Sequence, residues 1–257
     1  MKTLRNILLG LILPVFIVLA WWIATTYGNV PGSILPPLNE VGQAFKKMWS
    51  SGQLQKDILI SLSRVVKGYG IAVLVGISIG TIAGMSGIAE KIFMPTMTTI
   101  RQIPMIAWIP LIILWCGIGE TSKVVIIVLA AFFPILVNTY SGIRGTPDNY
   151  IEVARMYKLG RFKKFIKLYL PHAVPNILVG LKLGLGVSWM AVVASELVAA
   201  VSGIGYRMNF ARTMMHSDKV IVCMIVVGLI GILMDKLLSV LFELITPWEK
   251  NNRAKNK

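Results

Sequence analysis

Residues 148–171 read Asp-Asn-Tyr-Ile-Glu-Val-Ala-Arg-Met-Tyr-Lys-Leu-Gly-Arg-Phe-Lys-Lys-Phe-Ile-Lys-Leu-Tyr-Leu-Pro and lie between two long apolar runs. The stretch holds six Lys or Arg but only two acids, Asp148 and Glu152. Such a charge density cannot lie in hydrocarbon, and its sign predicts that the stretch faces the cytoplasm. Gly160 permits a turn, and the second, amphipathic part is expected to end at Pro171. The stretch therefore predicts a short helix, a bend and a second helix on a membrane surface.

The composition of the whole chain is that of an integral membrane protein. Of its 257 residues 56% are hydrophobic and 14% are charged, and the mean hydropathy is +0.74, whereas about a quarter of the residues of soluble proteins are charged. The net charge of +15 lies mainly in short segments between the apolar runs and at both termini. We therefore expect attraction to anionic membrane lipid and no binding of nucleic acid. The G-x-x-x-x-G-K-[ST] pattern does not occur, so any ATP must be bound by another chain, and no cofactor is expected.

Six apolar runs are long enough to cross a bilayer. The predicted fold is all-α, with one transmembrane domain over residues 1–257, a cytoplasmic loop at 142–172, and spans at about 7–26, 66–85, 92–115, 123–141, 174–201 and 220–245. The first run is long for a signal peptide and lacks an A-x-A-like site, so we expect it to remain as a span. The segments predicted to lie inside hold 14 Lys and Arg, and those predicted to lie outside hold 5. This asymmetry predicts that both termini are cytoplasmic.

Two of the spans carry residues that shape helix packing. Three glycines recur at every fourth residue of the second span, at Gly76, Gly80 and Gly84, which lets a neighbouring helix approach closely. Three prolines interrupt the third span, at Pro95, Pro104 and Pro110, and are expected to kink it or open its backbone. Freed backbone groups survive in a membrane only inside protein or beside water, so this span is a candidate to line a solute route. Outside the spans, an amphipathic helix lying on the membrane is predicted at 40–48 within the external segment 27–60.

The spacing of residues in the basic loop resembles a known motif. Glu152-Val153-Ala154 is followed after three residues by Lys158, and after nine more by Leu168-x-Leu170-Pro171. This spacing resembles the EAA loop of permease subunits in binding-protein-dependent ABC importers, whose consensus is Glu-Ala-Ala, three residues, Gly, nine residues, then Ile-x-Leu-Pro. The residues that depart from the consensus are Val153, Lys158 and Leu168. Lysine disfavours the positive φ that glycine adopts, and Gly160 can supply the bend instead.

The resemblance implies a role for the loop in coupling the chain to an ATPase. The residues that match the motif or its bend are Glu152, Ala154, Lys158, Gly160, Leu170 and Pro171. The simpler alternative is an ordinary basic loop, as the positive-inside rule produces in many membrane proteins.

Residues 101–120 carry a second resemblance. They contain Pro104, the run Ala107-Trp108-Ile109-Pro110-Leu111 and the end Trp115-Cys116-Gly117-Ile118-Gly119. The corresponding span of the sulfonate, taurine and nitrate importer subfamily has a Pro, an Ala-x-x-Pro-Leu run and a Trp-Phe-Gly-Ile-Gly end, so Cys116 stands in the place of a Phe. Residues 195–205 also resemble the end of the fifth span in that subfamily.

Candidate residues for a solute pathway come from the third and fifth spans. Glu196 is an acid within a span, so it is either functional or a hydrogen-bonded carboxylate that joins helices. Arg101 offers two parallel donors to an oxyanion, or else extends its side chain to the membrane interface. The other candidates are Gln102, Pro104, Trp108, Pro110, Ser188 and Ser195. No catalytic residue or metal ligand is predicted, because the serines lack a nearby base and His172 and His216 lie far apart in the sequence.

Taken together, the resemblances imply a MetI-like type I permease fold and the transmembrane subunit of an ABC importer in the bacterial cytoplasmic membrane. They imply two copies of this chain, two ATPase subunits and an extracytoplasmic substrate-binding protein. The expected solute is a small anion such as an aliphatic sulfonate, taurine or nitrate, and a pyrimidine vitamin precursor or riboflavin is the alternative. An ion-driven secondary transporter that acts alone would need titratable groups in the membrane, for which Glu196 and Asp235 are the main candidates.

Overall fold

The computed structural model describes the backbone of residues 2–28 and 30–245, and every regular element in these residues is helical. The elements are α1 (Lys2–Tyr27), α2 (Leu38–Ser50), α3 (Gln53–Met85), α4 (Gly87–Ile100), α5 (Met105–Cys116), α6 (Glu120–Arg144), α7 (Asp148–Met156), α8 (Arg161–Lys164), a π-helical turn (Phe165–Tyr169), α9 (Leu170–Ala199), α10 (Ile204–Thr213) and α11 (Ser217–Ile245). The predicted all-α fold is confirmed for this part of the chain. The basic tail at 247–257 lies outside the described residues.

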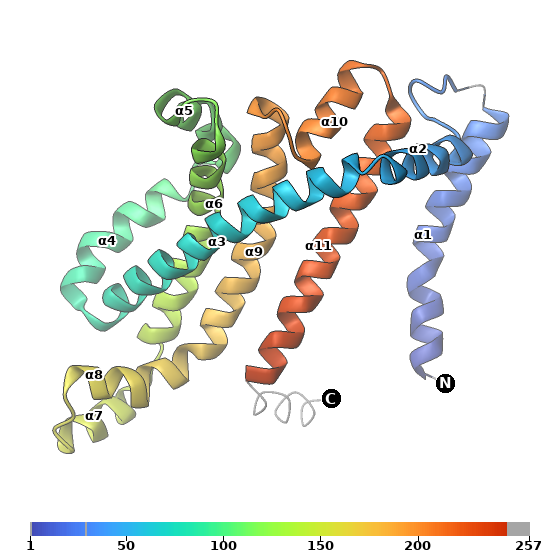
Figure 1. Cartoon of the computed structure of the whole chain (residues 1–257). Coiled ribbons are helices and arrows are strands. Elements are labelled where there is room, and N and C mark those ends of the chain that lie inside the picture. The colour runs from blue at the N-terminus through green and yellow to red at the C-terminus, as the bar shows by residue number, and fades with distance from the viewer. Residues whose placement is uncertain (1, 29, 246–257) are drawn as a thin grey trace.

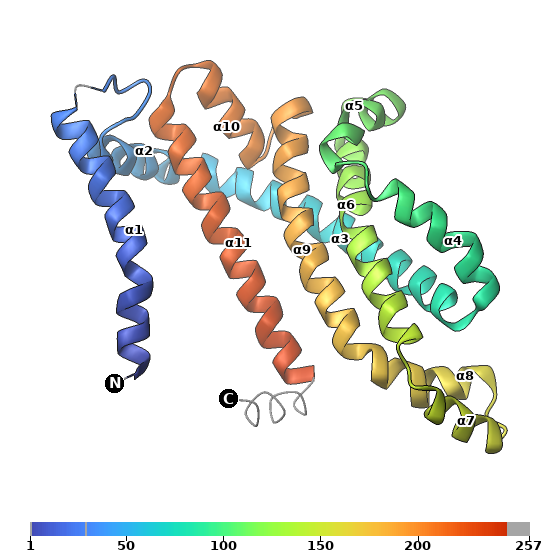
Figure 2. The same cartoon turned by 180° about the vertical axis from the view of Figure 1, so that it is seen from behind.

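The long helices form a row that one helix crosses. α6, α9, α11 and α1 lie side by side, and α3 crosses the row on one face, as the two opposite views agree (Figures 1 and 2). Short helices lie at the two ends of these long helices, with α2, α5 and α10 at one end and α7 and α8 at the other (Figure 1). The start of α1 and the end of α11 lie at the same end as α7 and α8.

Glycines allow α3, α6 and α9 to pack closely against one another. A Cβ placed on Gly76 or Gly84 of α3 would lie 2.9 Å from Ile135 or 2.7 Å from Ile143, both of which belong to α6. A Cβ on Gly184 of α9 would lie 2.9 Å from the same Ile135. The close approach predicted for the glycine stripe is therefore confirmed, and the neighbouring helix is α6.

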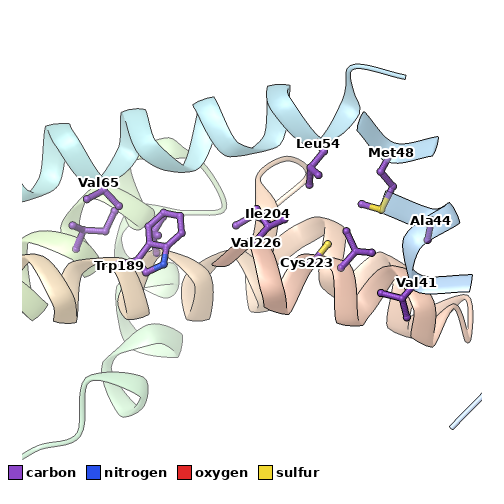
Figure 3. Packing of buried hydrophobic residues seen from close by; sticks show 12 residues of the cluster. Val41, Ala44, Met48, Leu54, Val65, Trp189, Ile204, Cys223 and Val226 are labelled. Carbon is purple, nitrogen blue, oxygen red and sulfur yellow. The ribbon is translucent and has the colours of Figure 1, made fainter. Parts of the chain in front are cut away.

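A buried apolar cluster joins the short helices to the row. Side chains from α2, α3, α9, α10 and α11 meet in it, and they include Met48, Leu54, Trp189, Ile204 and Cys223 (Figure 3). The amphipathic helix predicted at 40–48 is confirmed as α2, but its buried face packs on α11 and α3 instead of lying only on lipid.

The structure contains a bent helix pair where the third span was predicted. Within the described residues five helices are long and apolar enough to cross a membrane, and α4 with α5 makes a sixth span if the pair counts as one. The pair is bent by 99° at residues 101–104, because Pro104 has no N–H to continue a helix and restricts the residue before it. The predicted opening of the backbone in 92–115 is confirmed at this proline, whereas Pro95 and Pro110 lie inside α4 and α5.

Two helices extend beyond their predicted limits. α3 begins at Gln53 instead of near residue 66, because the polar side chains of its first turns are paired with other helices. The segment from Arg161 to Ala199 is one continuous helix, which bends where α8 passes into α9 (Figures 1 and 2) and which we call the rod. The prediction that Pro171 ends a helix is therefore wrong. Pro171 lies in the first turn of α9, where a missing N–H is tolerated, and the π-helical turn precedes it.

Candidate functional site

The basic loop forms two short helices with a bend between them, as predicted. Ala154 is the buried residue of α7 and is 5% exposed, whereas Glu152 lies on the exposed side. Large exposed side chains of apolar character accompany Glu152 on α7 and at its end, namely Tyr150, Val153, Met156 and Tyr157. α7 therefore presents a mixed apolar and charged face at one end of the molecule (Figure 1).

The bend after α7 is a Schellman motif centred on Lys158. The amide of Lys158 donates to the carbonyl of Arg155 at 2.8 Å, and the amide of Leu159 donates to the carbonyl of Ala154 at 3.1 Å. Lys158 has a φ of +50°, which is the left-handed conformation usually taken by glycine at this position of the motif. The lysine thus adopts the backbone conformation that the consensus glycine would favour. Gly160 has a φ of −63°, which any residue can adopt, so the prediction that Gly160 supplies the bend is wrong.

Leu170 connects the loop to the helical row. It is half-buried and packs in a cluster with Ile143 of α6 and Ala173 of α9. Pro171 next to it is exposed. Because α8, the π-helical turn and α9 are continuous, the loop is joined to α9 without a flexible linker.

A polar cluster lies at the end of the long helices opposite to α7 and α8, and we call it the polar clamp; it is buried or half-buried except at Glu120, whose side chain is 66% exposed. It consists of Asp57, Ser61, Arg64, Glu120, Glu196, Ser202 and Arg207. Arg64 is 1% exposed and donates from Nη1 to Glu196 Oε1 at 2.7 Å and from Nε to Glu120 Oε2 at 2.7 Å. Its Nη2 also donates to the other oxygen of Glu120. This guanidinium therefore joins α3 to α6 and α9.

Further hydrogen bonds satisfy the buried carboxylate of Glu196. Ser61 Oγ donates to Glu196 Oε1 at 2.8 Å, and the amide of Gly205 donates to Oε2 at 2.9 Å. Gly203 has a φ of +106°, and a Cβ at this residue would collide with the Glu196 carboxylate, so the turn before α10 requires glycine here. Of the two interpretations of Glu196, this geometry favours a carboxylate that joins helices.

The polar clamp also fixes the first turn of α10. The amide of Gly203 donates to Asp57 Oδ1 at 3.1 Å, and Arg207 Nε donates to Asp57 Oδ2 at 2.7 Å. The amide of Ile204 donates to Ser61 Oγ at 3.0 Å. The backbone amides at the start of α10 thus find their partners on α3, and that of Gly205 on α9, as buried donors require.

A cavity of about 490 Å³ lies between α5, α6 and α9. It brings together three of the predicted pathway residues, Arg101, Pro104 and Trp108, with Phe133, Asn138, Leu183 and Val187. Of the described residues that line it, Arg101 is the ionisable one. Gln102 and Pro110 are exposed and lie outside this lining.

The two predicted pathway serines lie outside the same lining. Ser188 and Ser195 are buried, and each hydroxyl donates at 2.8 Å to a carbonyl of its own helix, that of Gly184 or Val192. Glu196 belongs to the polar clamp. Ser188, Ser195 and Glu196 are therefore not among the residues that line the cavity with Arg101 and Trp108.

Sequence reasoning missed two groups of polar residues. Asp57, Ser61 and Arg64 precede the predicted second span, yet their spacing puts them on one face of a helix, which is the signal that would have joined them. Lys182 was also missed, although it is a lone cation within the apolar run 174–201. Its Nζ lies 3.1 Å from Asp235 Oδ2 of α11.

The described part of the chain is helical throughout its regular elements, with five or six apolar helices, a basic helix pair at one end and a cavity between helices, which are the features of a membrane transport subunit. The sequence profile of one family, described as the binding-protein-dependent transport system inner membrane component, matches residues 72–250. The chain belongs to this family and is the permease subunit of an ABC importer, which is a transport subunit and not an enzyme.

Individual relatives are similar over most of the chain. The SsuC protein of Bacillus subtilis (strain 168), named for aliphatic sulfonates transport, is 35% identical over 94% of this chain and 88% of its own length. The taurine transport system permease protein TauC of Escherichia coli (strain K12) is 33% identical over 89% of this chain and 85% of its own. The nitrate import permease protein NrtB of a Synechocystis species is 34% identical over 76% of this chain and 70% of its own. The resemblance to the sulfonate, taurine and nitrate subfamily is thereby confirmed.

The conformation of Lys158 can be tested by substitution. We expect Lys158→Gly to stabilise α7 by about 1 kcal/mol, because glycine removes the steric cost of the left-handed conformation. In hydrogen–deuterium exchange, the amides of α7 should then exchange roughly fivefold more slowly. Gly160→Ala is the matched control and should change nothing, since a Cβ there has open space. Faster exchange in Lys158→Gly would contradict the assignment of the bend to Lys158.

The polar clamp predicts a loss of stability on neutralising one partner. We expect Glu196→Gln to destabilise the detergent-solubilised chain by about 3 kcal/mol, because the buried guanidinium of Arg64 loses a buried counter-ion. The midpoint of thermal unfolding should fall by roughly 5–10 °C. Glu40→Gln, at an exposed acid, is the control and should leave the midpoint unchanged. Equal midpoints for Glu196→Gln and the unaltered chain would show that the ion pair does not hold the helices.

Proposed function

We propose that this ABC importer permease carries a small oxyanion such as an aliphatic sulfonate, taurine or nitrate. The observation that carries the proposal is the cavity of about 490 Å³, in which Arg101, an exposed residue, is the one ionisable member of an otherwise apolar and amide-bearing lining among the described residues. A guanidinium presents parallel donors that match two oxygens of one anion. The volume suits a small ligand, and the names of the relatives point to the same class of solute.

The alternatives have less support from the geometry. A neutral pyrimidine would leave the Arg101 charge without a partner in the cavity. An ion-driven transporter needs a carboxylate free to bind the ion, whereas Glu196 is paired with Arg64 and Asp235 with Lys182. We therefore favour an anion over a vitamin precursor or a coupling ion.

The assembly that we propose contains two copies of this chain, two ATPase subunits and an extracytoplasmic binding protein. α7 would dock in a groove of the ATPase, with Glu152 supplying charge and Val153 and Met156 supplying apolar contact, since all three are exposed. The excess of Lys and Arg in this loop supports a cytoplasmic location for it. The start of α1 and the end of α11 lie at the same end (Figure 1), which supports cytoplasmic termini.

The continuous helix suggests how ATP in a partner acts on the solute route. Closure of the nucleotide-bound ATPase pair would move α7 and α8, and the rod from Arg161 to Ala199 would carry that movement to the cavity wall at Leu183 and Val187. In each position of the rod the solute route would be open to one side of the membrane. ATP binding would thus shift the population between inward-open and outward-open states.

The solute is tested by uptake into vesicles that contain the complete transporter with its ATPase and binding protein. We expect uptake of radiolabelled taurine, methanesulfonate or nitrate, and an at least tenfold lower kcat/KM for it in Arg101→Gln, because a charge-assisted hydrogen bond contributes about 1.5–3 kcal/mol. Lys91→Gln removes an exposed cation outside the cavity and should leave uptake unchanged. Uptake of a neutral pyrimidine, with none of any anion, would overturn the proposed solute class.

The ATPase contact is tested by a charge placed on the exposed face of α7. We expect Met156→Asp to reduce the ATPase that co-purifies with the chain at least tenfold, because docking would bury this carboxylate in an apolar contact. Met214→Asp is the control and should keep the ATPase bound, because this exposed methionine directly follows α10, which lies at the opposite end of the molecule from α7 (Figure 1). If both variants retain the ATPase equally, α7 is not the docking helix.

A further inference from the structure

An ion pair lies half-exposed on the long apolar helices, away from the polar clamp. Lys182 Nζ is 3.1 Å from Asp235 Oδ2, and the two side chains are 43% and 56% exposed. Lys182 lies near the middle of α9 (Leu170–Ala199), so neither end of the helix is within easy reach of its side chain. A charge pair exposed to hydrocarbon is costly, so this face of the chain must border water or protein.

The ion pair lines a hollow that adjoins the Arg101 cavity. The hollow has a volume of about 360 Å³ and is lined by Lys182 and Asp235 together with Gly186 and Met190. Leu183 and Val187 line both the hollow and the Arg101 cavity. The hollow and the Arg101 cavity are therefore neighbours on either side of the ridge of α9 that Leu183 and Val187 form. Each has one cationic side chain among its lining residues.

Lys182 has the capacity to bind a further group. Its ammonium group has three donors, and two of them are used by Asp235 Oδ2 and by Ser239 Oγ, the latter at 3.0 Å. Gly186 beside it has open space where a Cβ would lie, so the hollow is not filled by its own helix. A small oxyanion would supply an acceptor for the third donor and would compete with Asp235 for the others.

We propose that Lys182 is a second oxyanion-binding residue, which receives the anionic group of the solute next to Arg101, with Asp235 as its counter-ion when no solute is bound. The proposal rests on the proposed function for the class of solute. The planar guanidinium of Arg101 would donate two parallel hydrogen bonds to the anion, whereas the ammonium group of Lys182 would attract it as a compact point charge. Because Asp235 offsets part of the charge, the anion is bound weakly enough at Lys182 to be released.

The test compares charge variants in the complete transporter with ATPase and binding protein, using labelled taurine and methanesulfonate as probes. We expect Lys182→Gln to lower uptake at least tenfold and Lys182→Arg, which keeps the cation, to restore most of it. Lys236→Gln removes the exposed neighbouring cation of α11, which lies outside the hollow, and should match the unaltered chain.

A double variant separates solute binding from a purely structural ion pair. If Lys182 binds the solute, Lys182→Gln with Asp235→Asn stays as low as Lys182→Gln alone, because the cation is still missing. If the pair only joins α9 to α11, neutralising both partners restores uptake, and the proposal is overturned. Full uptake by the single variant Lys182→Gln overturns it as well.

A thiol measurement makes the proposal testable independently of the transported solute. In a chain with Cys116→Ser and Cys223→Ala, we expect Lys182→Cys to react with an anionic methanethiosulfonate reagent that carries a sulfonate. Leu13→Cys, at an exposed position of α1, should not react, because the thiolate needs water. A reactive thiol at 182, together with no uptake of any of the anions by the transporter that keeps Lys182, would count against the solute class alone. An unreactive thiol at 182 would show that water does not reach the hollow, and would overturn the binding site itself.

Discussion

The cost of an unpaired charge in a low-dielectric environment decides much of this structure. A charged side chain at the centre of a bilayer costs at least about 2.5 kcal/mol, so each one must find a partner. Arg64 is enclosed by the carboxylates of Glu120 and Glu196, and Lys182 is paired with Asp235. In the first group Arg64 and Glu196 are buried while the Glu120 side chain is exposed, and the group fastens three helices at one end. The pair of Lys182 and Asp235, in contrast, is half-exposed beside a hollow. The same constraint thus produces a fixed junction in one place and an open binding group in another.

One continuous helix, the rod, connects the basic loop, the wall of the Arg101 cavity and the polar clamp. It begins at Arg161 next to the loop, passes the ridge of Leu183 and Val187, and reaches Glu196 in the polar clamp. The π-helical turn at Phe165–Tyr169 lies where the rod leaves the loop, which is where such turns adjust helix direction without breaking it. Because the polar clamp fixes the far end, a movement that enters at the loop would act on the rod as a tilt about that end.

The sequence predicted the parts of the fold that depend on hydropathy and charge, and missed those that depend on pairing between distant residues. The helices and the basic loop follow from apolar runs and clustered lysines. The early start of α3 does not, because Asp57, Ser61 and Arg64 look like the residues of an aqueous loop until their partners on α9 and α10 are known. Pro171 looked like a helix end because its effect depends on the turn that precedes it. In the candidate pathway, Arg101 and Trp108 share a cavity, whereas Ser188 turned out to bond within its own helix.

The departure of the loop from its motif also has a physical explanation. A left-handed conformation costs an L-residue about 1–2 kcal/mol, and Lys158 adopts it. The same position lies just past the C-terminus of α7, where a cation interacts favourably with the helix dipole by about 0.3–1 kcal/mol. The two Schellman hydrogen bonds, from Lys158 to Arg155 and from Leu159 to Ala154, satisfy carbonyls that would otherwise be left at the helix end. The dipole therefore offsets part of the strain, and the backbone keeps the bend although the residue has changed.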